Sequence, residues 1–198
     1  MGKRQENAME TKQKLIGAAR ALREEKSFDD ILIEEITERA GVAKGTFYTY
    51  FKRKEDVFCE LAFASFDAIK EKLADSQKNA AGQIAEYLSL SMEVIIADGL
   101  EVAQQWMKNA MAPMEEDSQA MRKYRYDMEY LTGCLERTVQ SGEFPQMSVK
   151  AAAEQIITQY YGIVAVWCLT NGKLEAQERM NDFCRETLES IINNPAGK

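Results

Sequence analysis

The sequence predicts an all-α protein in which an N-terminal three-helix domain with a helix-turn-helix motif precedes a larger helical domain. Apolar residues recur three and four positions apart along nearly every long segment, which is the period of an amphipathic helix. Glycine and proline residues separate these segments, and strand-like alternation of useful length does not occur. We therefore expect about nine helices, with the first domain over residues 9–69 and the second over residues 70–198.

Residues 1–8 are mostly polar or charged, and we expect them to form a loose arm. Between about residues 11 and 26, apolar side chains then follow a helical stripe at Leu15, Ala18 and Leu22. This first helix should pack behind the two motif helices that follow, with Phe28 closing the small core.

The helix-turn-helix motif is predicted over about residues 32–51. Its first helix places Ile33, Ile36 and Ala40 on one face, and Gly41 follows where a helix commonly ends in a residue of positive φ. The second helix, about residues 44–50, places Phe47 on its inward side, together with Phe51 four positions later. Two short helices joined by a glycine-containing turn form the arrangement whose second helix enters the major groove of DNA.

The outward face of the second motif helix carries the chemical groups that bind DNA. It offers an ammonium, a hydroxyl and two phenols, and Lys52, Arg53 and Lys54 follow at its end. Cations and hydroxyl donors bind phosphate oxygens, while threonine and tyrosine also contact base edges. Gly45 has no side chain and so permits close approach to a sugar-phosphate ridge. The alternative is a solvated helical hairpin with a chance run of lysines.

A resemblance to the tetracycline-repressor (TetR) family is carried by residues 40–56, AGVAKGTFYTYFKRKED, and extends over about residues 11–68. It implies an all-helical dimer, and most members of that family are repressors released from DNA by a small ligand. It also implies that Lys54 is a phosphate clamp at the start of the next helix. The residues implied as recognition-helix contacts are Lys44, Gly45, Thr46, Tyr48 and Tyr50.

Several positions depart from the pattern of that family, and many members have Thr residues and an Arg where this chain has Ile31, Leu32 and Glu34. Ala43 stands where members usually have Ser or Glu, so the second motif helix lacks a side-chain N-cap, which costs about 1 kcal/mol. Glu34 stands in a segment where many members hold a phosphate or a base, and its carboxylate would repel a phosphate. We therefore expect DNA sequence specificity to depend on the second motif helix.

Six further helices are expected after the motif. The first of them connects the DNA-binding domain to the rest of the chain, and in the TetR family this helix transmits ligand binding. The expected extents are about residues 54–75, between Gly82 and Gly99, from about Val102 to before Pro113, from after Asp117 to near Gly142, residues 149–169 and about residues 175–192.

The helix over residues 149–169 has little charge after Glu154, so much of its circumference must be covered. We expect one face to pack in its own subunit and another against a partner. With the final helix it would form a four-helix bundle across a two-fold axis, giving a homodimer through the last two helices. The alternative is a helix buried entirely within its own subunit.

A small, mostly apolar effector is expected to bind in the second domain. Methionine and aromatic side chains give an adaptable apolar lining with a few hydrogen-bonding groups, which is typical of such pockets. The alternative for each of these residues is ordinary core packing. The candidates are Trp106, Met107, Met111, Tyr126, Tyr130 and Trp167.

Composition excludes several other functions. Residues 1–56 carry 12 Lys or Arg and 11 Asp or Glu, whereas the remainder carries 13 and 21, which argues against a protein that coats DNA or an anionic membrane. The chain has no histidine, four widely spaced cysteines and no phosphate-binding glycine-rich loop, so we expect no metal, no cofactor and no enzymatic activity. Nothing resembles a signal peptide or a membrane span, and we expect a cytoplasmic protein.

The sequence therefore predicts a dimeric DNA-binding transcriptional regulator, more readily a repressor than an activator, which a ligand releases from a palindromic operator. Two alternatives remain open. One is a regulator of the same fold controlled by a protein partner, and the other is an all-helical scaffold that does not bind DNA.

Overall fold

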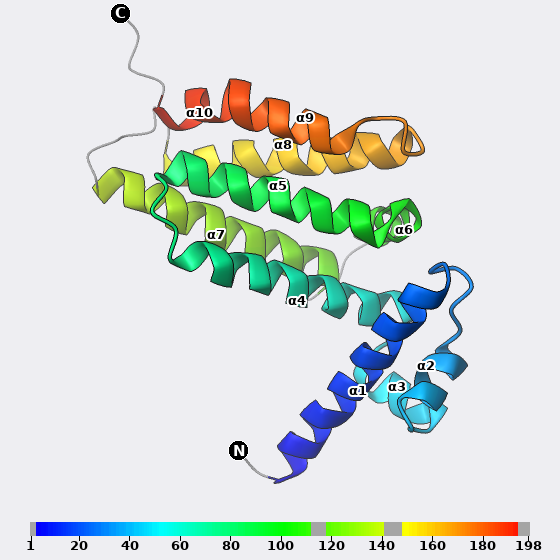
Figure 1. Cartoon of the computed structure of the whole chain (residues 1–198). Coiled ribbons are helices and arrows are strands. Elements are labelled where there is room, and N and C mark those ends of the chain that lie inside the picture. Colours follow the sequence, from blue (N-terminus) through cyan, green and yellow to red (C-terminus); the bar gives the residue numbers. More distant parts are fainter. Residues whose placement is uncertain (1–2, 112–117, 141–147, 194–198) are drawn as a thin grey trace, which may run out of the picture. The chain divides into compact units, whose positions relative to one another are not determined.

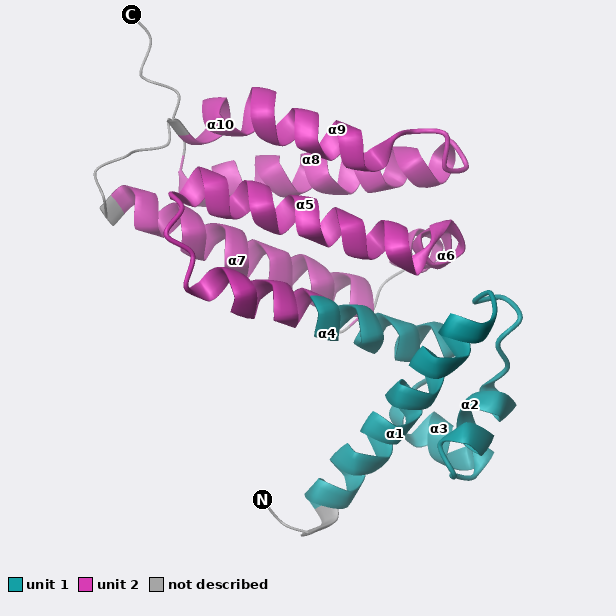
Figure 2. Cartoon of the chain, viewed as in Figure 1, with its two compact units in different colours: residues 1–65 teal, residues 66–198 magenta. Residues whose placement is uncertain are grey.

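The structure, a computed structural model, describes residues 3–111, 118–140 and 148–193, and every regular element in these ranges is helical. This confirms the predicted fold class. The chain divides into two compact units, Met1–Ser65 and Phe66–Lys198 (Figure 2). The expected helix end near Gly142 and the positions of Pro113 and Asp117 lie outside the described residues.

Unit 1 (Met1–Ser65) contains three helices and the first part of a fourth. They are α1 (Lys3–Glu25), α2 (Ile33–Arg39), α3 (Lys44–Tyr50) and the beginning of α4 (Lys54–Ala74) (Figure 1). Phe28 is buried and its ring meets that of Phe58 edge to face, with 5.0 Å between centroids. The small core that the apolar stripes predicted is completed by Leu15, Ala19, Leu22, Ile31, Ile36, Phe47, Phe51 and Val57, all buried.

The expected loose arm was wrong for residues 3–8, because α1 begins at Lys3. Residues 3–16 contain neither glycine nor proline and are rich in Lys, Glu and Gln, which have high helix propensity. Local bonds support this helix. Lys14 pairs with Glu10 at 2.8 Å, and the Thr11 hydroxyl donates to the Asn7 carbonyl at 2.8 Å. Propensity summed over the segment therefore decides its structure despite its polarity.

The turn between α2 and α3 has the conformation that the sequence predicted. Gly41 adopts φ +68°, and the Val42 N–H donates to the Thr37 carbonyl at 3.0 Å. Ala43 is the N-cap of α3, with extended backbone and no side-chain hydrogen bond. The predicted absence of a side-chain cap is therefore confirmed, and the Thr46 N–H donates instead to the Ala43 carbonyl at 2.8 Å.

Unit 2 (Phe66–Lys198) is a bundle formed by the end of α4 and the helices that follow it. Three of them, α5 (Ala80–Asp98), α7 (Gln119–Gln140) and α8 (Val149–Leu169), lie side by side, and α6 (Leu100–Ala110) packs at one end (Figure 1). The last helix consists of α9 (Ala176–Phe183), a π-helical turn (Cys184–Leu188) and α10 (Glu189–Asn193), which follow without a break. The core includes Tyr87, Leu88, Met92, Leu131, Leu135, Ile156, Tyr160 and Met180.

Local signals account for the helix ends of unit 2. The Ser148 side chain accepts from the Ala151 N–H at the start of α8, and Asn171 and Gly172, with φ +53° and +79°, follow its end. The expected start of α5 at Gly82 was wrong, because Gly82 is the third residue of the helix and donates its N–H to the Asn79 side chain at 2.9 Å. In the described part of the chain, no helix combines the length and apolar character needed to cross a membrane.

Candidate functional site

Helix α3 is anchored by one side and exposed on the other. Phe47 is fully buried and Phe51 is 3% exposed, so these two rings fix the helix against the core of unit 1. Lys44, Gly45 and Tyr48 are exposed, with Tyr48 52% exposed. The Tyr48 ring, which stays in solvent beside the buried Phe47, is therefore available to a binding partner of unit 1.

The remaining recognition-helix candidates, Thr46 and Tyr50, are half-buried. Thr49 is exposed on the same helix, and its hydroxyl donates weakly to the Gly45 carbonyl at 3.4 Å. Sequence reasoning passed over Thr49, although its position one residue after Tyr48 on a polar face was a usable signal. The structure thus presents one short polar face composed of hydroxyls, a phenol and an ammonium.

Gly45 is not required by the packing of unit 1. A Cβ built on its backbone meets no atom within 4 Å, and its φ is not in the left-handed region. A side chain would therefore fit in the free protein. The absence of one leaves the start of α3 open to a surface that approaches closely.

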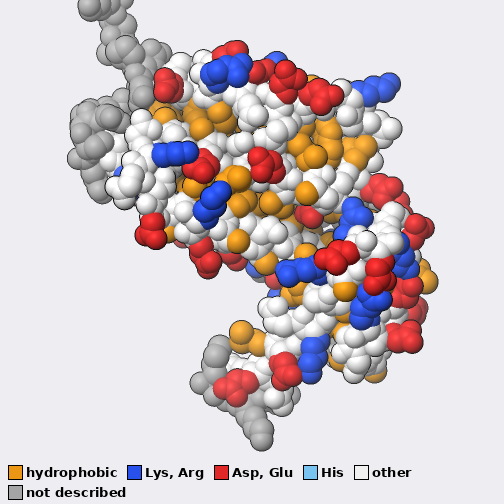
Figure 3. Space-filling model, in the orientation of Figure 1, with side chains coloured by type: hydrophobic (Ala, Val, Ile, Leu, Met, Phe, Trp, Pro, Cys, Tyr) orange, Lys and Arg blue, Asp and Glu red, His pale blue; other side chains and the backbone are white. Residues whose placement is uncertain are grey.

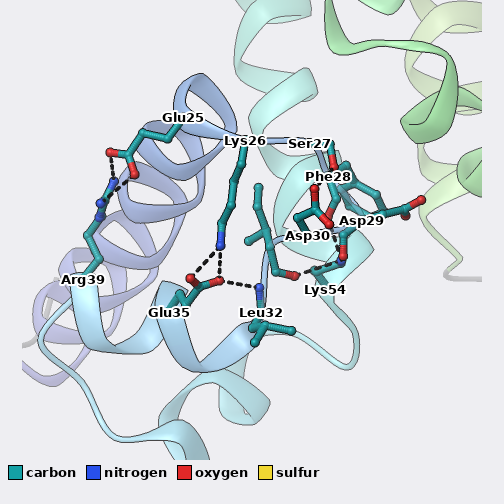
Figure 4. Close-up of polar contacts among 11 residues, drawn as sticks. Glu25, Lys26, Ser27, Phe28, Asp29, Asp30, Leu32, Glu35, Arg39 and Lys54 are labelled. Atoms are coloured by element: carbon teal, nitrogen blue, oxygen red, sulfur yellow. Dashed lines mark hydrogen bonds and ion pairs between the residues drawn. The ribbon is translucent and has the colours of Figure 1, made fainter.

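Two ion pairs, which Figure 4 shows, hold α2 to the last residue of α1, Glu25, and to Lys26, which follows it. The Arg39 guanidinium contacts both carboxylate oxygens of Glu25 at 2.6 and 3.0 Å. Lys26 binds both oxygens of Glu35 at 2.6 Å, and Glu35 also accepts the Leu32 N–H at 2.9 Å. The hydrogen bond from Lys26 lowers the pKa of Glu35, so this carboxylate stays ionised where it orients the start of α2.

A third ion pair joins α2 to α3. The ammonium of Lys44, the first residue of α3, lies 2.5 Å from Oε1 of Glu34. This hydrogen bond lowers the pKa of Glu34 and raises the pKa of Lys44. The cation that the sequence predicted for DNA is therefore paired with a carboxylate of the preceding helix in the free protein.

Lys54 directs its ammonium at the turn before α2 (Figure 4). Its Nζ lies 2.7 Å from the Phe28 carbonyl, 3.0 Å from the Ile31 carbonyl and 3.3 Å from the Asp29 carbonyl. It also lies over the Phe28 ring, 4.3 Å from its centroid. An ammonium has three N–H donors, and all three are used here, so a contact to phosphate requires Lys54 to leave these carbonyls.

On the face drawn in Figure 3, acidic and basic side chains are interspersed rather than gathered into one basic patch. This agrees with the near balance of charges in residues 1–56. Contact with DNA would then depend on a few placed groups rather than on a broad positive field.

The six candidate effector residues of unit 2 lie on or just after α6, on α7 and on α8. The Trp106 ring on α6 lies 5.9 Å from the ring of Tyr161 on α8, whereas Met111, just after α6, is 75% exposed. Trp167 on α8 is 7% exposed and Met107 is half-buried. Tyr126 and Tyr130 lie one turn apart on α7.

These two tyrosines lie against the end of α4. The Tyr126 hydroxyl donates to Asp67 Oδ1 at 2.7 Å, and the Lys70 ammonium donates to the Tyr126 carbonyl at 3.0 Å. The same ammonium lies 3.1 Å from the centroid of the Tyr126 ring and 5.4 Å from that of Tyr130. We call Asp67, Lys70 and Tyr126 the α4–α7 clip. It fastens the end of α4 to the bundle.

A buried polar network that sequence reasoning missed lies at the centre of the bundle. The Asp127 carboxylate is fully buried and accepts from Lys123 at 2.5 Å, from the Tyr87 hydroxyl at 2.5 Å and from the Tyr161 hydroxyl at 2.8 Å. Burial raises the pKa of both tyrosines and lowers that of Lys123, although Asp127 opposes the latter effect. The network links α5, α7 and α8 through one carboxylate.

Comparison with known proteins agrees with this architecture. The family described as "Bacterial regulatory proteins, tetR family" matches residues 15–61. The fatty acid metabolism regulator protein of Bacillus subtilis (strain 168) is 28% identical over 192 residues, covering 91% of this chain and 94% of the relative. The Transposon Tn10 TetC protein of Escherichia coli is 43% identical over 53 residues, which cover 27% of each chain.

Among solved structures, the transcriptional regulator FadR of Bacillus subtilis superposes with a TM-score of 0.64 at 23% identity, covering 93% of this chain and 99% of that one. This likeness shows a common fold. Three observations indicate the same kind of protein: the helix-turn-helix motif in α2 and α3, the family match over residues 15–61, and the relatives that share the fold. Residues 15–61 match the DNA-binding segment of the TetR family, and the chain is a DNA-binding transcriptional regulator similar to proteins of that family.

Proposed function

We propose that the protein is a homodimeric repressor that binds a palindromic operator through α3 and leaves it when unit 2 binds a mostly apolar, fatty acyl-type effector. One observation carries this proposal. Similarity to the fatty acid metabolism regulator extends over 91% of the chain and so includes unit 2, whereas the likeness to TetC covers only 53 residues. A relationship confined to the DNA-binding segment would say nothing about the effector.

In this proposal residues 9–69 bind DNA and residues 70–198 dimerise and bind the effector. The contacts to base edges and phosphates come from Lys44, Gly45, Thr46, Tyr48 and Tyr50. Support comes from the exposure of Lys44, Gly45 and Tyr48 on α3, whose opposite side is buried. The predicted phosphate clamp at Lys54 competes with its three carbonyl contacts.

Dimerisation through the last two helices is supported by an exposed apolar stripe on α8. Val166 is 43% and Leu169 84% exposed, and Gly162, one turn before Val166, would let a second helix approach closely. A dimer also meets the geometry of an operator, whose half-sites lie about 34–36 Å apart. Leu169→Glu should therefore yield a folded monomer in sedimentation experiments, because the side chain is already outside the core of its own subunit. A Leu169→Glu protein that remained dimeric would remove α8 from the interface.

The effector class is supported by the FadR protein of Bacillus subtilis, whose structure was determined in complex with stearoyl-CoA. Release requires the effector to favour a conformation with lower DNA affinity, by as much as its affinity differs between the two conformations. Helix α4 belongs to both units, and the α4–α7 clip fastens its second half to α7. We propose that α4 carries the change from the effector to α3.

The test is operator release followed by fluorescence anisotropy. Stearoyl-CoA, stearate, acetyl-CoA and coenzyme A are each added to the protein bound to a labelled operator duplex. The proposal predicts release by at least one of the long-chain compounds and none by acetyl-CoA or coenzyme A. The releasing compound should also raise the melting temperature of the DNA-free protein, since it stabilises the native state by mass action. If none of the four changes either signal, the fatty acyl effector is wrong, and control by a protein partner takes its place.

A further inference from the structure

The ion pair between Glu34 and Lys44 has little to contribute to folding. The two side chains are 58% and 52% exposed, and exposed ion pairs typically stabilise a fold only weakly. The attachment of α2 to α1 does not need it, because Glu35 and Arg39 already pair with Lys26 and Glu25. We therefore look for an effect of this ion pair on binding rather than on folding stability.

Its position puts it at the DNA-binding face. Lys44 is the first residue of α3, and the N-terminal residues of a recognition helix are those that reach the DNA. Glu34 is the second residue of α2 and lies within hydrogen-bonding distance of that lysine. A DNA phosphate or guanine edge that binds the Lys44 ammonium must compete with this carboxylate, or else accept a pair whose net charge is zero.

We propose that Glu34 is a competitor for Lys44 that lowers the affinity of the protein for DNA and flattens the salt dependence of binding. It acts through Lys44 and is a positioning residue rather than a DNA contact. A lysine that binds phosphate releases counterions, whereas a lysine held by a carboxylate releases few. The inference rests on the DNA-binding function of the family and goes beyond it, because it assigns a role to a carboxylate that departs from the family pattern.

The experiment compares Glu34→Gln with Glu38→Gln, a matched control that removes the same charge from an exposed position one turn further along α2. Binding to a duplex selected from random DNA, and to an unselected duplex of equal length, is measured between about 50 and 300 mM salt. We expect Glu34→Gln to bind both duplexes roughly two- to five-fold more tightly at about 0.1 M salt. The slope of log K against log salt should steepen by about 0.9, while Glu38→Gln changes neither quantity.

Dependence on Lys44 is tested by a double-mutant cycle, which isolates the interaction between the two residues. Lys44→Met should weaken binding only slightly in the wild-type background and several-fold more in the Glu34→Gln background. Equal losses in the two backgrounds would overturn the proposal and indicate direct repulsion of DNA by Glu34. A loss of affinity for the selected duplex in Glu34→Gln would also overturn it, because Glu34 would then contact the DNA itself.

The result with the wild-type protein distinguishes failure of this inference from failure of the DNA-binding function on which it rests. If the wild-type protein binds no duplex DNA, the DNA-binding function fails. If wild type binds and Glu34→Gln leaves affinity and slope unchanged, only the role of Glu34 fails. Melting temperatures of both glutamine variants should stay close to that of wild type, since neither carboxylate lies in the core.

Discussion

Replacement of Lys54 by methionine distinguishes a structural role from the predicted phosphate clamp. The methionine keeps most of the aliphatic side chain but removes the ammonium from the carbonyls of Phe28, Asp29 and Ile31. A hydrogen bond to a charged group contributes about 1.5–3 kcal/mol when it is well shielded. Lys54 is only half-buried, and two of its three acceptors are part-buried, so we expect a total loss of about 2 kcal/mol. For a chain of this length that corresponds to a melting temperature lower by about 4–8 °C.

The assay combines thermal unfolding with the salt dependence of DNA binding. Lys52→Met, two residues earlier and exposed, controls for the loss of one positive charge and should leave the melting temperature nearly unchanged. If Lys54→Met unfolds at the wild-type temperature and the slope of log K against log salt becomes shallower by about 0.9, the ammonium binds phosphate and the structural role is refuted. If the melting temperature falls and the slope stays the same, Lys54 stabilises the turn between α1 and α2.

Four further single substitutions, one of them also combined with a second change, test the same account. Gly45→Ala should leave the melting temperature unchanged or slightly higher, because the added Cβ meets no atom within 4 Å, but weaken operator binding about ten-fold, which is 1.4 kcal/mol; equal affinity would exclude a close approach of DNA there. Ala43→Ser supplies the missing N-cap of α3 and should stabilise the protein by about 1 kcal/mol, seen as a rise of about 2–4 °C on melting. Lys123→Met leaves the Asp127 carboxylate buried without its cation and should cost about 3–5 kcal/mol, part of which the added Asp127→Leu change should restore; urea titration of both variants measures the difference. Tyr126→Phe removes the hydrogen bond to α4 at a cost of about 1 kcal/mol, and it should raise the effector concentration needed for half-release while leaving ligand-free operator affinity unchanged.

The helix-turn-helix motif could be predicted from sequence because its signals are local. Gly41 takes the positive φ that its place after α2 predicted, and Phe47 and Phe51 are buried as their spacing required. The extent of α8 also agreed, since a serine N-cap and an Asn-Gly pair mark its two ends. Patterns within one helical turn or one cap were sufficient for these elements.

Interactions between segments that are distant in the sequence could not be predicted from it. Tyr87 and Asp127 are 40 residues apart, and nothing in either helix alone indicates that they meet. Asp127 lies on the inward stripe of α7, four residues before Leu131, and this position was the available signal. It did not suffice, because a charged pair such as Lys123 and Asp127, spaced by four residues on a helix, is usually solvated. The contacts of Lys54 could not be predicted for the same reason. Its basic neighbours suggested that it binds phosphate, whereas the carbonyls that it contacts precede it by more than 20 residues.

The central claim is tested most directly by selecting binding sites for the wild-type protein from random duplex DNA and measuring affinity for the selected sequence. Our account predicts a palindromic consensus, two chains per duplex and a dissociation constant of about 10⁻⁸ M or lower at physiological salt. Selection that enriches no sequence, with weak binding that disappears at physiological salt, would contradict the account and would favour an all-helical scaffold.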